Sequence, residues 1–204
     1  MNTSGIRRQP QQARSSLKRA RILDAAQRLI FERGYGDTSV ADIARCAGVT
    51  KQNVYQMFAN KAAILAALVE RRASMIDSHG AAYLGATAMA GWRQTVREGV
   101  YSFYRLHRAD PTLDPLFIAG QDVAETRMIN VNSMAARVLT ASAQFAAVTQ
   151  LPDDQRMRDF ALVTMLSTSA IVRHALCLDE EAAGRLLDQQ VEVTITRLEI
   201  MGAK

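Results

Sequence analysis

The sequence predicts an all-α fold of about nine helices, divided into a small N-terminal domain and a larger C-terminal domain. Apolar residues recur every three or four positions along most of the 204 residues. Glycines, prolines and helix-capping residues separate these periodic stretches. Residues 1–61 have 11 Lys/Arg and 4 Asp/Glu, a net charge of +7, whereas residues 62–204 have 14 and 16, a net charge of −2. We therefore expect a basic head, residues 17–61, followed by a helical body, residues 62–204.

The first predicted helix of the head has one apolar face and one basic face. Gly34 after Arg33 is typical of a helix end, because glycine adopts the left-handed conformation without strain. The apolar positions at helical spacing are Ile22, Leu23, Ala25, Ala26, Leu29 and Ile30.

Two shorter helices follow, with a tight turn between them. Thr38 or Ser39 is placed to cap the second helix. Gly48 ends that helix, and Thr50 is placed to cap a third helix that runs from Lys51 to about Phe58. A helix, a turn that contains glycine and a helix with a polar face predict a helix-turn-helix, the motif that places its second helix in the major groove of DNA. The positive head favours the same interpretation, because DNA binding requires neutralisation of phosphates.

The head resembles the TetR/AcrR family of bacterial regulators over about Arg19 to Leu68. The motifs that carry the resemblance are ILDAA at Ile22 to Ala26, FERGY at Phe31 to Tyr35, TSVADIA at Thr38 to Ala44, AGVTK at Ala47 to Lys51, VYQMF at Val54 to Phe58 and NKAAIL at Asn60 to Leu65. The resemblance implies an all-helical dimeric regulator whose C-terminal domain binds a small inducer. Gln52 and Met57 depart from the family pattern in the third helix, which leaves the operator sequence open.

Four residues of the head are candidates for contacts with the DNA backbone. Thr50 offers the N–H groups of a helix N-terminus to phosphate. Ser39, at the start of the second helix, is a weaker candidate. The resemblance implies that Tyr55 and Lys61 contact the backbone as well, and Lys61 is expected to act as a mobile point charge.

Four further residues are candidates for reading bases. Lys51 suits the guanine acceptors, and Gln52 and Gln56 suit the donor and acceptor pair of adenine. Asn53 suits either a base or a phosphate. The alternative for Gln52 and Asn53 is an ordinary solvated helix face.

Residues 1–16 are polar and basic and have no apolar periodicity, which predicts a disordered tail. Arg7, Arg8 and Arg14 are candidates for contacts in an adjacent minor groove. The alternative, which we favour, is a tail that adds only nonspecific attraction to DNA.

The body is predicted to be helical throughout. The expected helices run from about Lys61 to Ser78, from Trp92 to Asp110, from Pro115 over a short apolar stretch, from Asp122 to about Val148, from Pro152 onward, and from Asp179 to the end. Gly80 to Gly91 is expected to form a loop. The stretch from Val191 to Thr196 alternates like a strand, but its helical surroundings lead us to assign it to the last helix.

An interrupted apolar stripe in the helix from Asp122 predicts a small-molecule site, because Arg127 and Asn130 stand among its apolar residues. A ligand cavity is mostly apolar with a few polar groups. We expect polar contacts from Arg127, Asn130 and His107, and an apolar wall from Trp92, Phe103, Tyr104, Phe117, Met128 and Met134. The alternative is a core position for the methionine and aromatic residues and for His107, and a place at the rim of the helix bundle for Arg127.

The last predicted helix has an apolar seam with spacings of 4, 3, 4 and 3 residues, typical of helices that pack lengthwise. In the family that the head resembles, the last two helices of each subunit form a four-helix dimer interface. We expect the seam to belong to that interface, and a twofold dimer to place its recognition helices about 34 Å apart, or a multiple of this. The seam residues are Leu187, Val191, Thr194, Leu198 and Met201.

Head and body together predict a sequence-specific transcriptional regulator, a dimeric repressor that a small, largely apolar ligand releases from a palindromic double-stranded DNA operator. The alternative is a ligand-independent structural or activator protein that acts at many sites. We expect no enzyme activity, because the sequence has no nucleophile motif, metal-ligand spacing or phosphate loop. We also expect no cofactor, no membrane span, a cytoplasmic location, and Cys46 and Cys177 reduced in separate domains.

Overall fold

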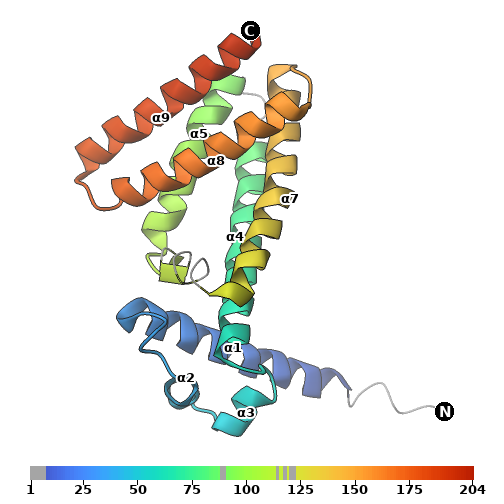
Figure 1. Cartoon of the computed structure of the whole chain (residues 1–204), viewed down its shortest axis with the longest axis vertical. Helices are drawn as coiled ribbons and strands as arrows, with labels where there is room; N and C mark the ends of the chain where they lie inside the picture. Colours follow the sequence, from blue (N-terminus) through green and yellow to red (C-terminus); the bar gives the residue numbers. More distant parts are fainter. Residues whose placement is uncertain (1–7, 88–90, 114, 117–118, 120–122) are drawn as a thin grey trace, which may run out of the picture. The chain divides into compact units, whose positions relative to one another are not determined.

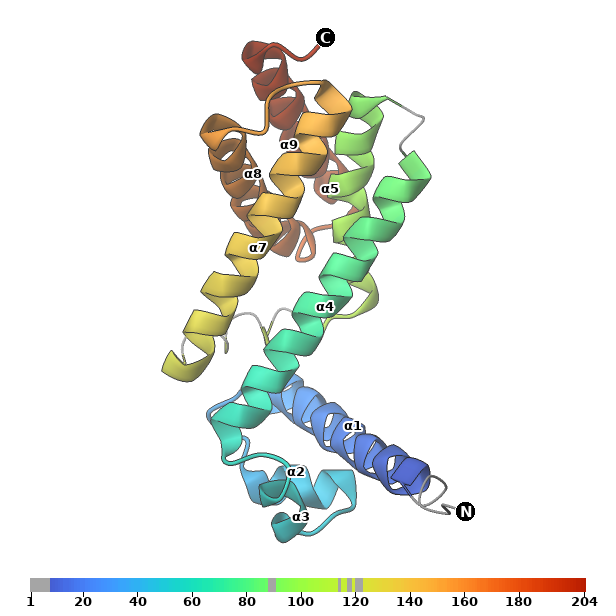
Figure 2. The same ribbon diagram turned by 90° about the vertical axis from the view of Figure 1, so that its right-hand side faces the viewer.

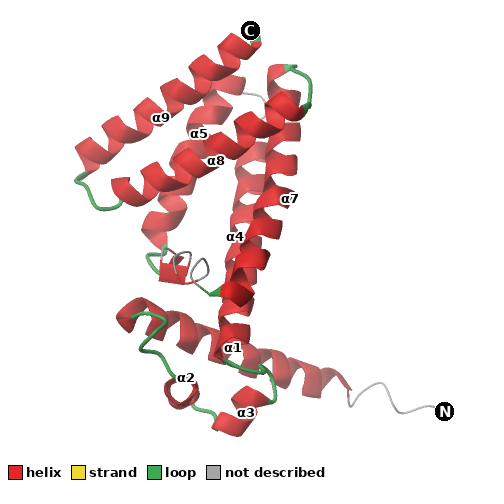
Figure 3. Cartoon of the chain, in the orientation of Figure 1, coloured by secondary structure: helices red, strands yellow, loops and turns green. Residues whose placement is uncertain are grey.

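The computed structural model describes residues 8–87, 91–113, 115–116, 119 and 123–204, and among these it contains eight helices and no strand (Figures 1 and 3). The described residues form two compact units. Unit 1 contains those up to Arg72 together with those between 115 and 130, and unit 2 contains the others. The all-α fold that the sequence predicts is thus confirmed.

Unit 1 is built on four helices. They are α1 (Arg8–Arg33), α2 (Val40–Ala47), α3 (Lys51–Tyr55) and the first part of α4 (Lys61–Thr87). Each helix contributes apolar side chains to one core, which includes Ile22, Ile43, Val54, Leu65 and Leu116. Because the apolar face of every helix is used in this core, the polar faces of α2 and α3 remain on the outside.

Local chemistry determines where α2 and α3 begin and end. The Ser39 hydroxyl accepts a hydrogen bond from the backbone N–H of Asp42, and the Asp42 carboxylate accepts one from the N–H of Ser39, so the pair forms a capping box. Gly48 ends α2 at a φ of 64°, in the left-handed region that favours glycine. Thr50 caps α3 by accepting a hydrogen bond from the N–H of Asn53 at 3.2 Å. The sequence predicted each of these helix ends.

Unit 2 contains α5 (Trp92–Ala109), α8 (Gln155–Ala175) and α9 (Glu180–Met201), with the remaining parts of α4 and α7 (Ala124–Thr149) (Figure 2). Helix α9 packs against both α5 and α8. The aspartates Asp154 and Asp179 cap α8 and α9 through their carboxylates. The largest fully buried side chains of this core are Met157, Phe160, Leu187 and Leu198.

Four boundaries differ from those predicted from the sequence. Helix α3 ends at Tyr55, where about Phe58 was expected. Helix α1 begins at Arg8, so residues 8–16 are helical although a disordered tail was predicted there. Helix α4 continues through Thr87, where a loop from Gly80 was expected, because three alanines between 81 and 86 favour the helix. The described residues between 115 and 130 belong to unit 1, whereas the prediction assigned them to the body.

Two other expectations concern single segments. The expected short helix from Pro115 lies largely outside the described residues. Val191 to Thr196 is helical within α9, as expected from its surroundings. None of the helices among the described residues has a stretch long and apolar enough to cross a membrane.

Candidate nucleic-acid interface

Helix α3 presents a polar surface on unit 1. Its inward residue, Val54, is fully buried in the core. The outward residues Lys51, Gln52, Tyr55 and Gln56 are exposed, and Asn53 is half-buried. Within the described part of the chain, none of these five side chains has a hydrogen-bond or ion-pair partner. The five are therefore available to another molecule, and they include all the residues that the sequence predicted to read bases.

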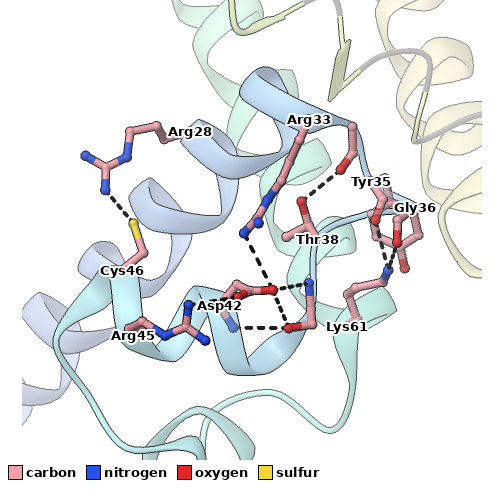
Figure 4. A network of polar contacts seen from close by, with 11 residues as sticks. Arg28, Arg33, Tyr35, Gly36, Thr38, Asp42, Arg45, Cys46 and Lys61 are labelled. Atoms are coloured by element: carbon pink, nitrogen blue, oxygen red, sulfur yellow. Dashed lines mark hydrogen bonds and ion pairs between the residues drawn. The ribbon is translucent and has the colours of Figure 1, made fainter.

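Asp42 fixes the start of α2 through a network of polar contacts (Figure 4). Its carboxylate accepts hydrogen bonds from the Ser39 hydroxyl at 2.5 Å and from the Ser39 backbone N–H at 3.3 Å. Arg45 and Arg33 form ion pairs with the same carboxylate at 3.3 and 3.6 Å. The Ser39 hydroxyl, helped by the two cations, lowers the pKa of Asp42 below its ordinary value. The Ser39 side chain, predicted as a weak phosphate contact, is thus used for capping.

Lys61 lies at the start of α4 and is held by unit 1 itself (Figure 4). Its Nζ donates hydrogen bonds to the carbonyl oxygens of Tyr35 at 2.9 Å and Gly36 at 3.4 Å, and lies 4.1 Å from the centroid of the Tyr35 ring. The sequence predicted a mobile point charge at this position, but the ammonium group is fixed. Since an ammonium group has three hydrogens, one remains for a phosphate.

Three arginines connect the helices of unit 1. The sequence had indicated only a basic face of the first helix for Arg19 and Arg21, and no role for Arg71. Arg21 donates from Nη2 to the carbonyl oxygen of Ala47, at the end of α2, at 2.6 Å. The guanidinium of Arg19 lies 5.2 Å from the centroid of the Phe58 ring. Arg71 on α4 pairs with Asp24 on α1 at 2.7 Å. These contacts join distant segments, so helical spacing alone could not indicate them.

The residues predicted to bind a small molecule in the body are distributed among several environments. Trp92 is buried in the core of unit 2, and its Nε1 donates a hydrogen bond to the Lys204 carbonyl oxygen at 2.8 Å. Phe103 and Tyr104 are half-buried against the same core. His107 is 2% exposed, and its Nδ1 lies 3.0 Å from the Phe103 carbonyl oxygen. These four residues therefore have structural contacts of their own.

The remaining predicted ligand residues lie on or near α7. Arg127 is exposed, so the stripe that included it is not buried along its whole length. Met134 is half-buried. Phe117 lies outside the described residues, as do the side chains of Met128 and Asn130. The small-molecule site that these residues were expected to form therefore stays a prediction.

Two polar groups inside unit 2 were missed by the sequence reasoning. Gln190 is 3% exposed, and its amide nitrogen lies 2.9 Å from the hydroxyls of both Ser167 and Thr168. Arg137 on α7 donates from Nε to Asp77 on α4 at 2.7 Å, and its buried Nη2 has no partner among the described residues. Both residues interrupt apolar stretches of the sequence. Because their partners come from other helices, the sequence pattern could not indicate what they bind.

The seam predicted for the dimer interface lies inside the protomer. Leu187, Val191, Thr194 and Leu198 are each at most 4% exposed, and Met201 packs against the same core. The assignment of these residues to a dimer interface is therefore corrected: their lengthwise packing is against α5 and α8 of the same chain. The seam was recognised correctly as a packing surface, but its partner was not.

A different surface of α8 and α9 carries exposed apolar residues. Five large apolar side chains there are between 36 and 74% exposed, and they are Leu162, Val163, Leu166, Val193 and Ile200. Near the turn between the two helices lies an open groove of about 330 Å³, lined by His174, Leu178, Ala182, Arg185, Leu186 and Gln189. None of the residues predicted to bind a ligand lines this groove.

The described residues contain no group of three or more His, Cys, Asp or Glu side chains that could hold a metal ion. Both cysteines are free, Cys46 half-buried in α2 and Cys177 exposed after α8. Cys46 accepts a contact from the Arg28 guanidinium (Figure 4).

Comparison with known proteins places the helix-turn-helix in a family. The model of the bacterial regulatory proteins, tetR family, matches residues 22–68. The transcriptional regulator TtgR of Pseudomonas putida is 42% identical over 74 residues, which are 36% of this chain and 33% of that protein. The regulator AlkX of Mycobacterium tuberculosis is 26% identical over 135 residues, 66% of this chain and 63% of that protein. The matched part of the chain thus spans about a third of TtgR and less than two thirds of AlkX.

Solved structures resemble the chain over most of its length. A TetR-family regulator from Streptomyces coelicolor matches with a TM-score of 0.69 at 21% identity, covering 91% of this chain and 97% of that one. FadR from Bacillus subtilis, solved in complex with stearoyl-CoA, matches with a TM-score of 0.62 at 19% identity, covering 89 and 96%. At such identities the likeness establishes the fold alone, a helix-turn-helix domain followed by a helical domain.

Proposed function

The chain belongs to the TetR family of bacterial regulatory proteins, and on this premise we propose that it is a sequence-specific transcriptional repressor that acts as a dimer and responds to a small apolar ligand. The observation that carries the proposal is the surface of α3. A capped helix that buries one residue and leaves five polar side chains without partners in the described chain has the chemistry of a recognition helix.

In the proposed complex, α3 enters the major groove. Lys51, Gln52 and Gln56 face the base edges, where lysine and glutamine find matching acceptors and donors. Asn53 and Thr50 lie at the N-terminal end of α3, next to a phosphate. The assignments of Lys51, Gln52 and Gln56 are supported by their exposure and by the lack of a side-chain hydrogen-bond partner in the described chain. The Thr50 hydroxyl is exposed as well, but it already accepts the hydrogen bond that caps α3.

Tyr55 and Lys61 are proposed to fix the register of the complex on the DNA backbone. Tyr55 is 53% exposed, so its hydroxyl is accessible to a phosphate oxygen. Lys61 retains one N–H, and the carbonyls of Tyr35 and Gly36 hold its ammonium group in place. A fixed cation loses less side-chain entropy when it binds a phosphate than a mobile one would.

The proposed dimer uses the exposed apolar surface of α8 and α9. Leu162 and Leu166 are one turn apart on α8, and Val193 and Ile200 are two turns apart on α9. Large apolar residues grouped at helical spacing on a surface are typical of a protein interface. A twofold dimer formed through this surface presents the same patch from both protomers.

The proposed ligand binds in unit 2, where the described part of the chain leaves Met134 half-buried and places the Arg137 guanidinium with one buried, unpartnered nitrogen. A ligand changes operator binding only if it prefers one of two conformations of the dimer. Coupling of this kind is typically worth about 1–3 kcal/mol, or roughly 5- to 150-fold in affinity. Operator binding that no compound changes in a broad screen of apolar molecules would contradict this part of the proposal.

The decisive experiment is recovery of bound fragments from sheared genomic DNA of the source organism at about 0.15 M salt, where nonspecific binding is weak. A repressor of this kind is expected to retain a few palindromic sites. Many scattered sites would favour the structural or activator alternative, and recovery of no site would contradict specific DNA binding.

A further inference from the structure

We propose that the N-terminal extension of α1 is a second DNA-binding surface, which contacts phosphates beside the site occupied by α3. The surface is the basic face of α1, defined as Arg14, Lys18 and Arg21. This inference rests on the proposed DNA-binding function and adds residues that lie outside the helix-turn-helix.

The extension consists of helical turns that unit 1 does not cover. The core of unit 1 begins at Ile22, whereas every residue from 13 to 21 is exposed, including Leu17 at 66%. Helices in proteins derive most of their stability from an apolar face packed against the rest of the fold. An exposed and strongly charged extension of this kind is better explained by a partner that covers it than by a role in the core.

The charge of the extension identifies the chemistry of the partner. Between Arg8 and Leu23 the chain has five Lys/Arg and no Asp or Glu. Arg14 and Lys18 are exposed, and neither forms an ion pair with any described residue. The first acid, Asp24, is already paired with Arg71. A row of cations without counter-charges fits a polyanion such as the phosphate backbone.

Helical geometry turns the basic face toward the helix-turn-helix. Arg21 reaches the carbonyl oxygen of Ala47, immediately before the turn between α2 and α3, at 2.6 Å. Lys18 lies three residues before Arg21, and Arg14 four residues before Lys18, so all three share one side of the helix. In both views α1 descends toward its N-terminal end, which lies level with α2 (Figures 1 and 2). The free cations therefore lie on the side of α1 that faces the end of α2, where the turn to α3 begins.

The test compares the salt dependence of DNA binding in Arg14→Ala/Lys18→Ala and in the original protein. Alanine is the best helix former, so these changes remove charge and keep the helix, which circular dichroism can verify. Loss of two phosphate contacts should make the slope of log K against log[salt] less negative by about 1.8 per protomer, at about 0.9 per phosphate. The ratio of specific to random DNA binding should stay constant, because phosphate contacts carry no sequence information.

A matched control removes the same charge elsewhere. Arg156→Ala/Lys204→Ala changes two exposed cations of unit 2 that have no ion-pair partner among the described residues, and it should leave the slope unchanged. Charge-preserving Arg14→Lys/Lys18→Arg should also keep the original slope. Leu17→Ala should have little effect on DNA binding, because a phosphate surface does not need the apolar side chain.

Three results would overturn the inference. An unchanged slope in Arg14→Ala/Lys18→Ala would show that the basic face does not contact DNA. A change in sequence preference would indicate base contacts in a groove instead of phosphate contacts. A larger effect from Leu17→Ala than from the double variant would indicate a protein partner or a second chain. If the original protein binds no DNA at all, the proposed function fails first, and that outcome is distinct from the other three.

Discussion

The polar side chains of α3 in unit 1 and those between the helices of unit 2 have opposite roles. In unit 1 the polar residues of α3 point outward and have no partners in the described chain, and capping residues such as Ser39 and Thr50 satisfy the backbone next to them. In unit 2 some polar residues join helices, as with buried Gln190 against α8 and half-buried Tyr101, whose hydroxyl donates to Asp188 on α9 at 2.7 Å. Burial raises the pKa of Tyr101, and the Asp188 carboxylate raises it further. The difference shows that α3 leaves its polar side chains available to another molecule, whereas in unit 2 such side chains hold helices together.

The largest expected effect tests the core of unit 2. Phe160 is 1% exposed and meets the Phe145 ring edge-to-face at 5.1 Å. Phe160→Ala should lower the free energy of unfolding by about 3–5 kcal/mol, because it removes buried contacts and leaves a cavity. Urea denaturation followed by circular dichroism measures the change. Phe31→Ala is the matched control, since Phe31 is 46% exposed, and a comparable loss there would contradict the contrast between core and surface.

The second effect tests the outward chemistry of α3. Gln52→Ala should weaken binding to the preferred operator by about 1–3 kcal/mol, since one pair of base contacts is lost. Binding to random DNA should be unchanged, and so should the stability of unit 1, because the Gln52 side chain has no partner in the described chain. Fluorescence anisotropy on both DNAs separates the two cases. An equal loss on both DNAs would exclude Gln52 as a base reader.

A smaller effect concerns the capping of α2. Ser39→Ala removes the side chain that accepts from the Asp42 N–H and donates to its carboxylate. Loss of an N-cap typically costs about 0.5–2 kcal/mol of stability. Ser78→Ala is a suitable control, because Ser78 is exposed on α4 and bonds only to the Ser74 carbonyl oxygen of its own helix. Thermal unfolding that ranks the two variants equally would contradict the capping role.

The smallest effect is a dependence on acid pH. The pKa of Asp42 is lower in the folded state than its ordinary value of 3.8, chiefly because of the Ser39 hydroxyl. A carboxyl whose pKa is lowered by folding stabilises the fold above its unfolded pKa, and this contribution is lost as the pH falls through the folded value. The stability difference between the original protein and Asp42→Asn should therefore be constant near neutral pH and shrink below about pH 4. A difference that does not change with pH would contradict the ionic role of Asp42.

Helix ends and the outward face of α3 could be predicted from the sequence because local chemistry determines them. Ser39, Gly48 and Thr50 act within three or four residues of their own position, and the helical period alone shows which residues of α3 point outward. Predictions that required knowledge of a distant partner were less successful. Lys61 was expected to be mobile, but its partners lie 25 and 26 positions away along the chain.

The body shows the same limit more strongly. The seam from Leu187 to Met201 was recognised as a packing surface, but periodicity does not distinguish a partner helix of the same chain from one of a second chain. Trp92 was assigned to the apolar wall of a ligand site and His107 to its polar contacts. In the structure Trp92 donates to the Lys204 carbonyl oxygen, and His107 Nδ1 lies 3.0 Å from the Phe103 carbonyl oxygen. An aromatic stripe has the same sequence pattern in a core and in a pocket, so only three-dimensional contacts separate the two.

The glycine that ends α2 limits which residues can be substituted at position 48. Gly48 has a φ of 64°, and a Cβ atom there would lie 2.8 Å from the Arg21 Nη2. Two independent filters therefore act on this position in a substitution library. Residues that tolerate the left-handed region, such as asparagine, pass the first filter, and they pass the second only if the Arg21 guanidinium moves away from Ala47. The substitutions tolerated at position 48 would thus show how much the hydrogen bond from Arg21 to Ala47 contributes to the stability of unit 1, without any change to Arg21 itself.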